Sequence, residues 1–133
     1  MVKINFFRKS FDNLPSKTPD PKKANVWFMV SGAREREKQI VASEFHYFSV
    51  DEDQSATYPI KLAREAWEEL AAGVGYIANL GDNSEGDIVI RRVYLAYYDP
   101  GLETEFYQPR VVFEGDREFV AYIPAITAEY YGE

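Results

Sequence analysis

The sequence contains no cysteine, a single histidine and no long apolar run. Without cysteine, disulfide bonds, thiolate nucleophiles and cysteine-ligated metal centres are excluded. The single histidine, His46, cannot build a cluster of imidazole ligands, and its position among aromatic residues favours a structural or surface role. No apolar run approaches the length of a membrane span, and Met1-Val2-Lys3 does not open a signal peptide. A cytosolic domain and an exported domain separated from its anchor both stay open.

Basic charge is also scarce, because 15 Lys and Arg residues face 22 Asp and Glu residues, giving a net charge of −7. An acidic surface repels phosphate backbones. The densest basic stretch, residues 34–38, is nearly neutralised by the alternating Glu35 and Glu37. We therefore expect no nucleic-acid partner.

Aromatic residues are abundant, with ten Tyr and nine Phe in a chain that is 46% hydrophobic. These residue types favour strands and half-buried surfaces. At 133 residues the chain fits a single domain, residues 1–133, that can bury roughly two-thirds of its unfolded surface. Composition therefore predicts a globular core that is large enough to be stable without disulfide bonds or a structural metal ion.

The N-terminal part reads as strands interrupted by a proline-rich surface excursion at residues 13–23. Strands are expected at residues 4–8, 25–31 and 39–50, the last two forming a hairpin across the polar residues 32–38. Alternation in the third strand places Val41, Phe45 and Tyr47 on one face and Ile40, Ala42, His46 and Phe48 on the other.

A helix is predicted at residues 61–72, with Gly73 as its left-handed cap. Its apolar stripe consists of Leu62, Ala66, Trp67, Leu70 and Ala71. Strands follow at residues 74–80, 88–98, 110–114 and 118–123, with a bulge at Arg91-Arg92 and a tight hairpin at Gly115-Asp116. The predicted fold class is α+β, one helix on a curved antiparallel sheet in the order βββ-α-ββββ. We expect Trp67 and Leu70 to be buried against Val93 and Leu95.

Two acidic loops imitate calcium sites without completing them. In the first, Asp51, Asp53, Ser55 and Thr57 alternate, but Ala56 replaces the turn glycine and Leu62 replaces the bidentate glutamate. The second contains Asp82, Asn83, Glu85 and Asp87 and is more typical of a hairpin turn. We expect neither a metal nor a cofactor. Nor do Glu65, Glu68 and Glu69, carboxylates on one helix, form an acid/base pair across a cleft.

The best candidates for a binding surface are aromatic residues outside the expected core face: Tyr94, Tyr98, Phe106 and Tyr107, together with Gln108. Phe106 and Tyr107 precede Pro109, which suits a strand start or an edge because proline offers no N–H to the ladder. Exposed aromatics beside such an edge are frequent interface hot spots. The alternative, in which these rings complete the core, stays open.

The C-terminal half resembles a known group of domains. The segments that carry the resemblance are Tyr58-Pro59-Ile60, Ala66-Trp67-x-x-Leu70, Gly73-x-Gly75-Tyr76-Ile77, and residues 93–98, 108–115 and 119–125. They resemble PepSY-like and YycH/YycI-type extracytoplasmic regulatory domains of bacterial membrane proteins and lipoproteins. The resemblance implies a helix on an antiparallel sheet and a regulatory or inhibitory role, and it assigns no functional residues. Residues 108–115 also loosely resemble the Gln-Val-Gly hairpin of cystatin-like inhibitors, but the spacing differs.

The expected function is therefore a non-enzymatic binding or regulatory module with a protein or peptide partner. The resemblance implies that it is the soluble extracytoplasmic or cell-surface part of a membrane-anchored bacterial protein, its anchor lying outside this sequence. Two alternatives are a small hydrolase that uses loop carboxylates and a cytosolic protein-interaction domain.

Overall fold

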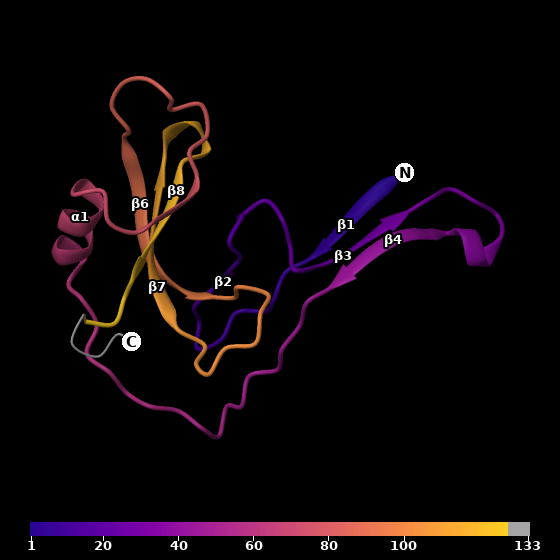
Figure 1. Ribbon diagram of the computed structural model, residues 1–133, viewed down its shortest axis with the longest axis horizontal. Coiled ribbons are helices and arrows are strands. Elements are labelled where there is room, and N and C mark those ends of the chain that lie inside the picture. Colours follow the sequence, from indigo (N-terminus) through magenta and orange to yellow (C-terminus); the bar gives the residue numbers. More distant parts are fainter. Residues whose placement is uncertain (128–133) are drawn as a thin grey trace.

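The computed structural model describes residues 1–127, which form two β-sheets and one α-helix (Figure 1). The strands are β1 (Val2–Phe6), β2 (Ser16–Lys17), β3 (Val26–Val30), β4 (Ile40–Phe45), β5 (Tyr76–Asn79), β6 (Ile90–Tyr98), β7 (Pro109–Gly115) and β8 (Val120–Pro124). The helix is α1 (Ala63–Ala71), and two 3-10 turns are η1 (Arg36–Lys38) and η2 (Asp116–Glu118). The α+β class is confirmed. Four strands precede the helix, however, and the strands form two sheets, not one.

The larger sheet has five strands in the order β2-β6-β7-β8-β5, all antiparallel except the short parallel β2–β6 pair. The bulge predicted at Arg91-Arg92 is confirmed by a shift of register between Ile90 and Arg92. The β7–β8 hairpin is also present, but its turn is longer than Gly115-Asp116. It runs through η2, where Arg117 and Glu118 take positive φ angles.

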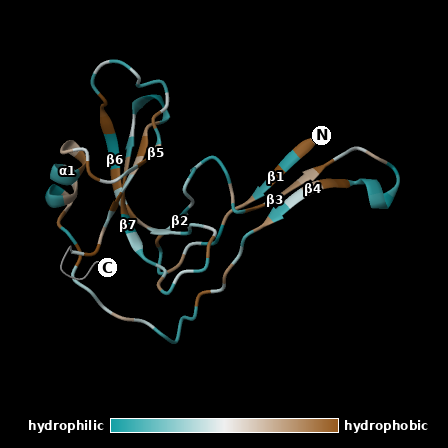
Figure 2. Cartoon of the chain, viewed as in Figure 1, coloured by the Kyte–Doolittle hydropathy of each residue, from teal (hydrophilic) through white to brown (hydrophobic). Residues whose placement is uncertain are grey.

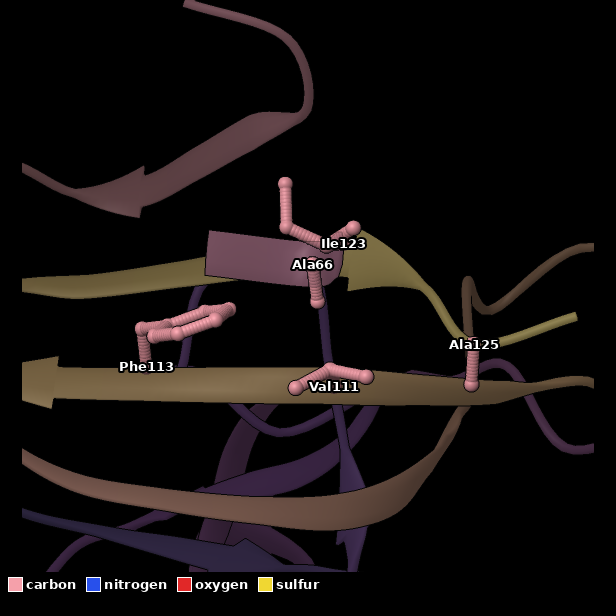
Figure 3. Packing of buried hydrophobic residues seen from close by; sticks show 5 residues of the cluster. All are labelled: Ala66, Val111, Phe113, Ile123 and Ala125. Atoms are coloured by element: carbon pink, nitrogen blue, oxygen red, sulfur yellow. The ribbon is translucent and has the colours of Figure 1, made fainter. Parts of the chain in front are cut away.

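Helix α1 packs on one face of the five-stranded sheet (Figure 3). Ala66 is fully buried in a cluster with Val111, Phe113 and Ile123, and Leu70 packs at its margin. The helix ends as its glycine predicts. Gly73 has φ +84°, its N–H donates to Leu70 O, and the next N–H, of Val74, donates to Glu69 O at 2.9 Å. This is the Schellman arrangement, which satisfies the last carbonyls of the helix.

The predicted burial of Trp67 is wrong, since its side chain is 46% exposed. The ring lies at the rim of the cluster, 6.2 Å from the ring of Phe113. Val93 is also half exposed. A nine-residue helix covers only the middle of a sheet, and the residue after Ala66 points about 100° away around the helix, toward the edge.

The opposite face of this sheet is covered by the proline-rich stretch. Its centre is a cluster of Ala96, Val112 and Tyr122. The Tyr122 hydroxyl donates to the Thr18 carbonyl at 2.8 Å. Thr18 and Ala24 are both buried. Residues 13–23 therefore lie at the surface and shield the second face of the sheet.

The smaller sheet has three antiparallel strands in the order β1-β3-β4, and the expected β3–β4 hairpin is confirmed. It extends away from the five-stranded sheet, and no residue in its strands is buried (Figure 1). Residues 46–62 then run from β4 to α1 along the outside of the molecule, and residues 51–60 are exposed throughout.

Candidate binding surface

One face of the three-stranded sheet is almost wholly apolar. Register determines its membership, because residues directly paired across an antiparallel sheet share a face. Three rows of paired residues form this surface, here called the apolar face: Val2, Val30 and Ile40; Ile4, Phe28 and Ser43; Phe6, Val26 and Phe45. Figure 2 shows the alternation of hydrophobic and hydrophilic residues along β1 that creates it.

The other face of the same sheet is mixed, with Lys3, Asn5 and Glu44 placed beside Trp27, Met29 and Ala42. Lys3 lies over the ring of Trp27, with its ammonium 4.6 Å from the ring centroid. The indole N–H of Trp27 donates to Glu44 at 3.1 Å. Nearby, His46 lies 3.7 Å from the same carboxylate and is exposed. Charged and amphipathic groups on one face and hydrocarbon on the other are typical of a sheet with one buried face.

Nothing in the described chain covers the apolar face. Phe45 is 69% exposed, Val2 64% and Ile4 42%. Single exposed apolar residues are ordinary on protein surfaces, but a contiguous group filling three strands marks an interaction surface. Within residues 1–127 the three-stranded sheet is therefore a single layer.

Sequence alternation misplaced one pair on this surface. It put Ile40 and Phe45 on opposite faces of their strand, whereas their partners, Val30 and Val26, lie on the same face of β3. A register shift between Met29 and Val30 skips one residue of β4, so the parity of the strand changes there. The alternation of Val2, Ile4 and Phe6 with Lys3 and Asn5 was the signal that could have revealed the surface from sequence.

A hollow of about 800 Å³ adjoins the Phe45 end of the apolar face. Phe6, Val26 and Phe45 line it from the three-stranded sheet. Asp99 and Tyr107, which flank the five-stranded sheet, also line it. The hollow therefore lies where the two sheets meet.

Arg8 links the two sheets beside this hollow. Its Nε donates to Asp99 Oδ2 at 3.2 Å, and its Nη2 donates to the Phe48 carbonyl at 2.7 Å. The guanidinium also lies 4.5 Å from the centroid of the Tyr47 ring and 5.4 Å from that of Tyr107. The guanidinium thus donates hydrogen bonds at its edge, and its faces lie against two tyrosine rings. These contacts fix the direction in which the three-stranded sheet extends from the rest of the molecule.

Tyr94 and Tyr98, two of the predicted binding residues, lie on the face opposite α1, as alternation predicted. The Tyr94 hydroxyl donates to Glu114 at 2.6 Å, and burial raises the pKa of this phenol, with the Glu114 hydrogen bond adding to the effect. Tyr98 packs edge-on to Tyr122 at 5.8 Å and carries the Arg110 guanidinium 5.0 Å from its centroid. Their role in binding stays a prediction.

The other three predicted residues are consecutive in the sequence but lie in different surroundings. Phe106 is about half exposed in the loop before β7. Tyr107 stacks on Tyr97 with centroids 4.7 Å apart, and its hydroxyl donates to Ser16 at 2.6 Å. The Gln108 carboxamide oxygen accepts a hydrogen bond from the Arg110 side chain at 3.2 Å, while its backbone carbonyl accepts from the Tyr98 N–H. Of the five predicted residues, only Tyr107 lines the hollow.

The acidic loops hold local turn structure. Asp51 accepts the N–H of Asp53 at 3.0 Å. In the second loop, the buried Asn83 side chain donates to the carbonyls of Leu80 and Asp116. Within residues 1–127, no three His, Asp or Glu side chains lie close enough together to hold a metal ion.

Comparison with known proteins found no matching family model, no similar curated protein and no similar solved structure. In the described part of the chain, no helix is long and apolar enough to cross a membrane.

Proposed function

We propose that this chain is a non-enzymatic module that binds a protein partner through the apolar face. The observation that carries the proposal is the three-stranded sheet itself: all its charged side chains lie on one face, and the other face consists almost wholly of Val, Ile and Phe and is left uncovered by residues 1–127. Burying each large apolar side chain on such a face contributes about 1.5–3 kcal/mol. A complementary partner surface would supply the missing layer.

The non-enzymatic part of the proposal draws support from the state of the carboxylates. Asp99 is bound by Arg8, and Glu69 accepts from Lys61 at 2.8 Å. Glu114 accepts from Tyr94 and from Arg92. Each of these three carboxylates is thus engaged by a neighbouring side chain of the chain itself.

The regulatory part of the proposal, and its setting outside the cytoplasmic membrane of a bacterium, derive from the resemblance of residues 58–125 to PepSY-like domains. A regulatory domain acts by occupying a partner, and this requires a surface and no reacting groups. The apolar face belongs to residues 2–45, outside the segment that carries the resemblance. The regulated partner would bind this N-terminal sheet while the C-terminal half provides the scaffold.

The test compares two double variants on the same strands. Ile4→Ser with Phe45→Ser removes apolar surface, whereas the control, Asn5→Ser with Ala42→Ser, alters the polar face. Each protein is immobilised and exposed to an extract of its source cells. Any captured partner is then mapped by hydrogen exchange on the purified complex. We expect capture by the wild type and the control only, with new protection in β1, β3 and β4.

Equal capture by the apolar-face variant would overturn the proposal, as would protection confined to α1 and β5. Circular dichroism must show matching melting temperatures for the two variants. Ile4 and Phe45 are both exposed, so little stability should be lost.

A further inference from the structure

We propose that the open edge of β6 is a second protein-binding site, which takes an extended segment of another protein as an added strand. The site belongs to the five-stranded sheet and is separate from the apolar face of the proposed function. Three observations carry the inference: the direction of the backbone groups of β6, the pairing of β2 on the same edge, and the apolar surface beside α1.

Strand β6 is paired on its outer side along only a small part of its length. On its inner side, β7 pairs with nearly all of its nine residues. On its outer side, β2 pairs only with Tyr97 and Tyr98. Among residues 1–127, no other strand pairs with β6. The outer side of residues 90–96 is therefore an open edge.

The hydrogen bonds at the end of β6 show which backbone groups point outward. The N–H of Tyr98 donates to the Gln108 carbonyl, on the side of β7, at 2.9 Å. The N–H of Tyr97 donates to the Pro15 carbonyl, on the outer side, at 2.9 Å. Successive residues of a strand direct these groups to opposite neighbours. The N–H and C=O groups of Val93 and Leu95 therefore point outward, and in the described part of the chain no strand or loop pairs with them.

A row of unpaired N–H and C=O groups is a template for another strand. Strand β2 shows that this edge accepts one. Its flanking carbonyls, of Pro15 and Lys17, accept hydrogen bonds from the N–H groups of Tyr97 and Asp99 at 2.9 and 2.8 Å. A partner strand would continue this ladder toward the start of β6. About five extended residues, roughly 17 Å in length, would span the open part.

The charged residues of β6 do not protect this edge. Native sheets often protect an open edge with charged side chains. Arg91 instead donates to both carboxylate oxygens of Asp116, at 2.9 and 3.0 Å. Arg92 donates to Glu114, on β7, at 3.2 Å. Both charges are thus drawn toward β7 and the turn that follows it, and residues 93–96 are left open to a partner.

The other edges of the two sheets are less suited to strand addition. Strand β5 has only four residues, with a shift of register between Ile77 and Asn79. Strands β1 and β4 border the three-stranded sheet, in which no strand residue is buried. Strand β6 contributes the fully buried Ala96 to the core. Its edge is therefore held in place by packing on the rest of the sheet.

Apolar side chains beside this edge specify the chemistry of the partner. Leu95 packs against the cluster beneath α1, and Val93, two positions away, shares its face. Val93 remains 46% exposed, as does Trp67 on the same side of the sheet. Apolar side chains at alternate positions of an added strand would lie beside Val93 and Leu95. The partner segment is therefore extended and apolar at every second residue.

Hydrogen exchange of the free chain, followed by NMR, tests whether the edge is open. The amides of Val93 and Leu95 should exchange at least about tenfold faster than those of Tyr94 and Ala96, which face β7. Equal protection of all four amides would overturn the inference, because the edge would then be covered.

A nine-residue peptide with Val at every second position, Thr between them and Lys at each end is the binding probe. Two further versions carry N-methyl groups on the Val amides or on the Thr amides. An added strand directs only every second amide toward β6. One methylated version should therefore bind at least about tenfold more weakly, and the other less than about threefold. No binding of the unmethylated peptide, or equal weakening in both versions, would overturn the inference.

Matched variants locate the peptide. Val93→Lys places a charge at the edge and should weaken binding at least about tenfold. Phe45→Ser, on the apolar face, is the control and should change binding less than about twofold. A loss of binding in Phe45→Ser with none in Val93→Lys would overturn the inference, because the peptide would then occupy the apolar face.

Two further measurements keep this test independent of the folding of the variant. The peptide should slow exchange of the Val93 and Leu95 amides in the wild-type chain, and unchanged exchange at both would contradict the added strand. Sedimentation of the chain alone should show no dimer that depends on this edge. A dimer that Val93→Lys abolishes would overturn the inference, since a second copy would then be the occupant.

Discussion

The Nε atom of Arg8 lies 3.2 Å from Oδ2 of Asp99, although 91 positions separate the two residues in the sequence. Both side chains are largely buried, at 13% and 12% exposure. The pair joins the segment that leaves β1 to the loop that follows β6, and Asn25 adds a hydrogen bond to the Asp99 carbonyl at 3.0 Å. A partly dehydrated ion pair therefore holds the three-stranded sheet to the rest of the molecule.

Replacing Arg8 with Ala should lower the free energy of unfolding by about 2–3 kcal/mol, because Asp99 would be left without its cation in a site that water barely reaches. Urea unfolding measures this loss. The control is Arg36→Ala in the exposed η1 turn, which should cost less than about 0.5 kcal/mol. Similar losses in the two variants would show that the Arg8–Asp99 pair does not anchor the sheet.

Asp116 should titrate below its usual range. Arg91 donates to both of its carboxylate oxygens, at 2.9 and 3.0 Å, and these bonds hold the pKa of Asp116 below its ordinary value of 3.8. A depressed folded-state pKa stabilises the fold above the unfolded-state pKa, and this contribution is lost as pH falls through the folded-state value. NMR titration of the carboxyl carbon should show an acidic midpoint that moves upward in Arg91→Gln. An unchanged midpoint in that variant would remove Arg91 as the cause.

Neighbouring helix positions should respond differently to substitution. Trp67→Ala should cost about 1–2 kcal/mol, less than the 3–5 kcal/mol typical of a buried Trp, because nearly half of its surface is already exposed. Ala66→Leu should cost about 2 kcal/mol by overpacking the cluster beneath α1. Ala63→Leu, at an exposed position of the same helix, is the control and should be nearly neutral. Thermal and urea unfolding compare the three, and an Ala66→Leu variant as stable as Ala63→Leu would contradict the packing.

Two glycines separate backbone strain from steric clash. Gly81 and Gly86 both have positive φ, +63° and +86°. A Cβ on Gly86 meets nothing within 4 Å, whereas one on Gly81 would meet the carbonyl oxygen of Arg117. Gly86→Ala should therefore cost only the strain of about 1 kcal/mol, and Gly81→Ala about 3 kcal/mol or more. Equal losses of unfolding free energy in urea would contradict the close approach of the Arg117 carbonyl to Gly81.

Local signals predicted the elements of the C-terminal half. The periodicity of residues 61–72 and the glycine at position 73 produced a helix that runs from Ala63 to Ala71 with the expected cap. The paired arginines at 91–92 predicted a bulge, since two charged residues in succession break alternation. These features depend on neighbours in the sequence, so sequence alone could specify them.

Features that depend on distant partners were not predictable in this way. The helical periodicity predicted that Trp67 points toward the sheet. Its ring instead lies at the rim of the cluster, because its position depends on how α1 sits on the sheet. The division into two sheets follows from pairings such as β2 with β6, which no local pattern reveals. The bulge in β4 reversed the face of Ile40, and this hid the full extent of the apolar face. The binding roles of the five predicted residues stay predictions: Tyr94, Tyr98, Phe106, Tyr107 and Gln108.

The exposed connection at residues 51–60 separates two segments of the chain that both contribute strands to the larger sheet. The segment before it contributes Ser16, which pairs with Tyr97, to the larger sheet. In the same segment, the Thr18 carbonyl accepts a hydrogen bond from the Tyr122 hydroxyl. If a protease cut this connection, the two fragments would still share the larger sheet. They would also keep the hydrogen bond from the Tyr122 hydroxyl to the Thr18 carbonyl and the Arg8–Asp99 ion pair. We therefore expect two such fragments to stay associated through these contacts.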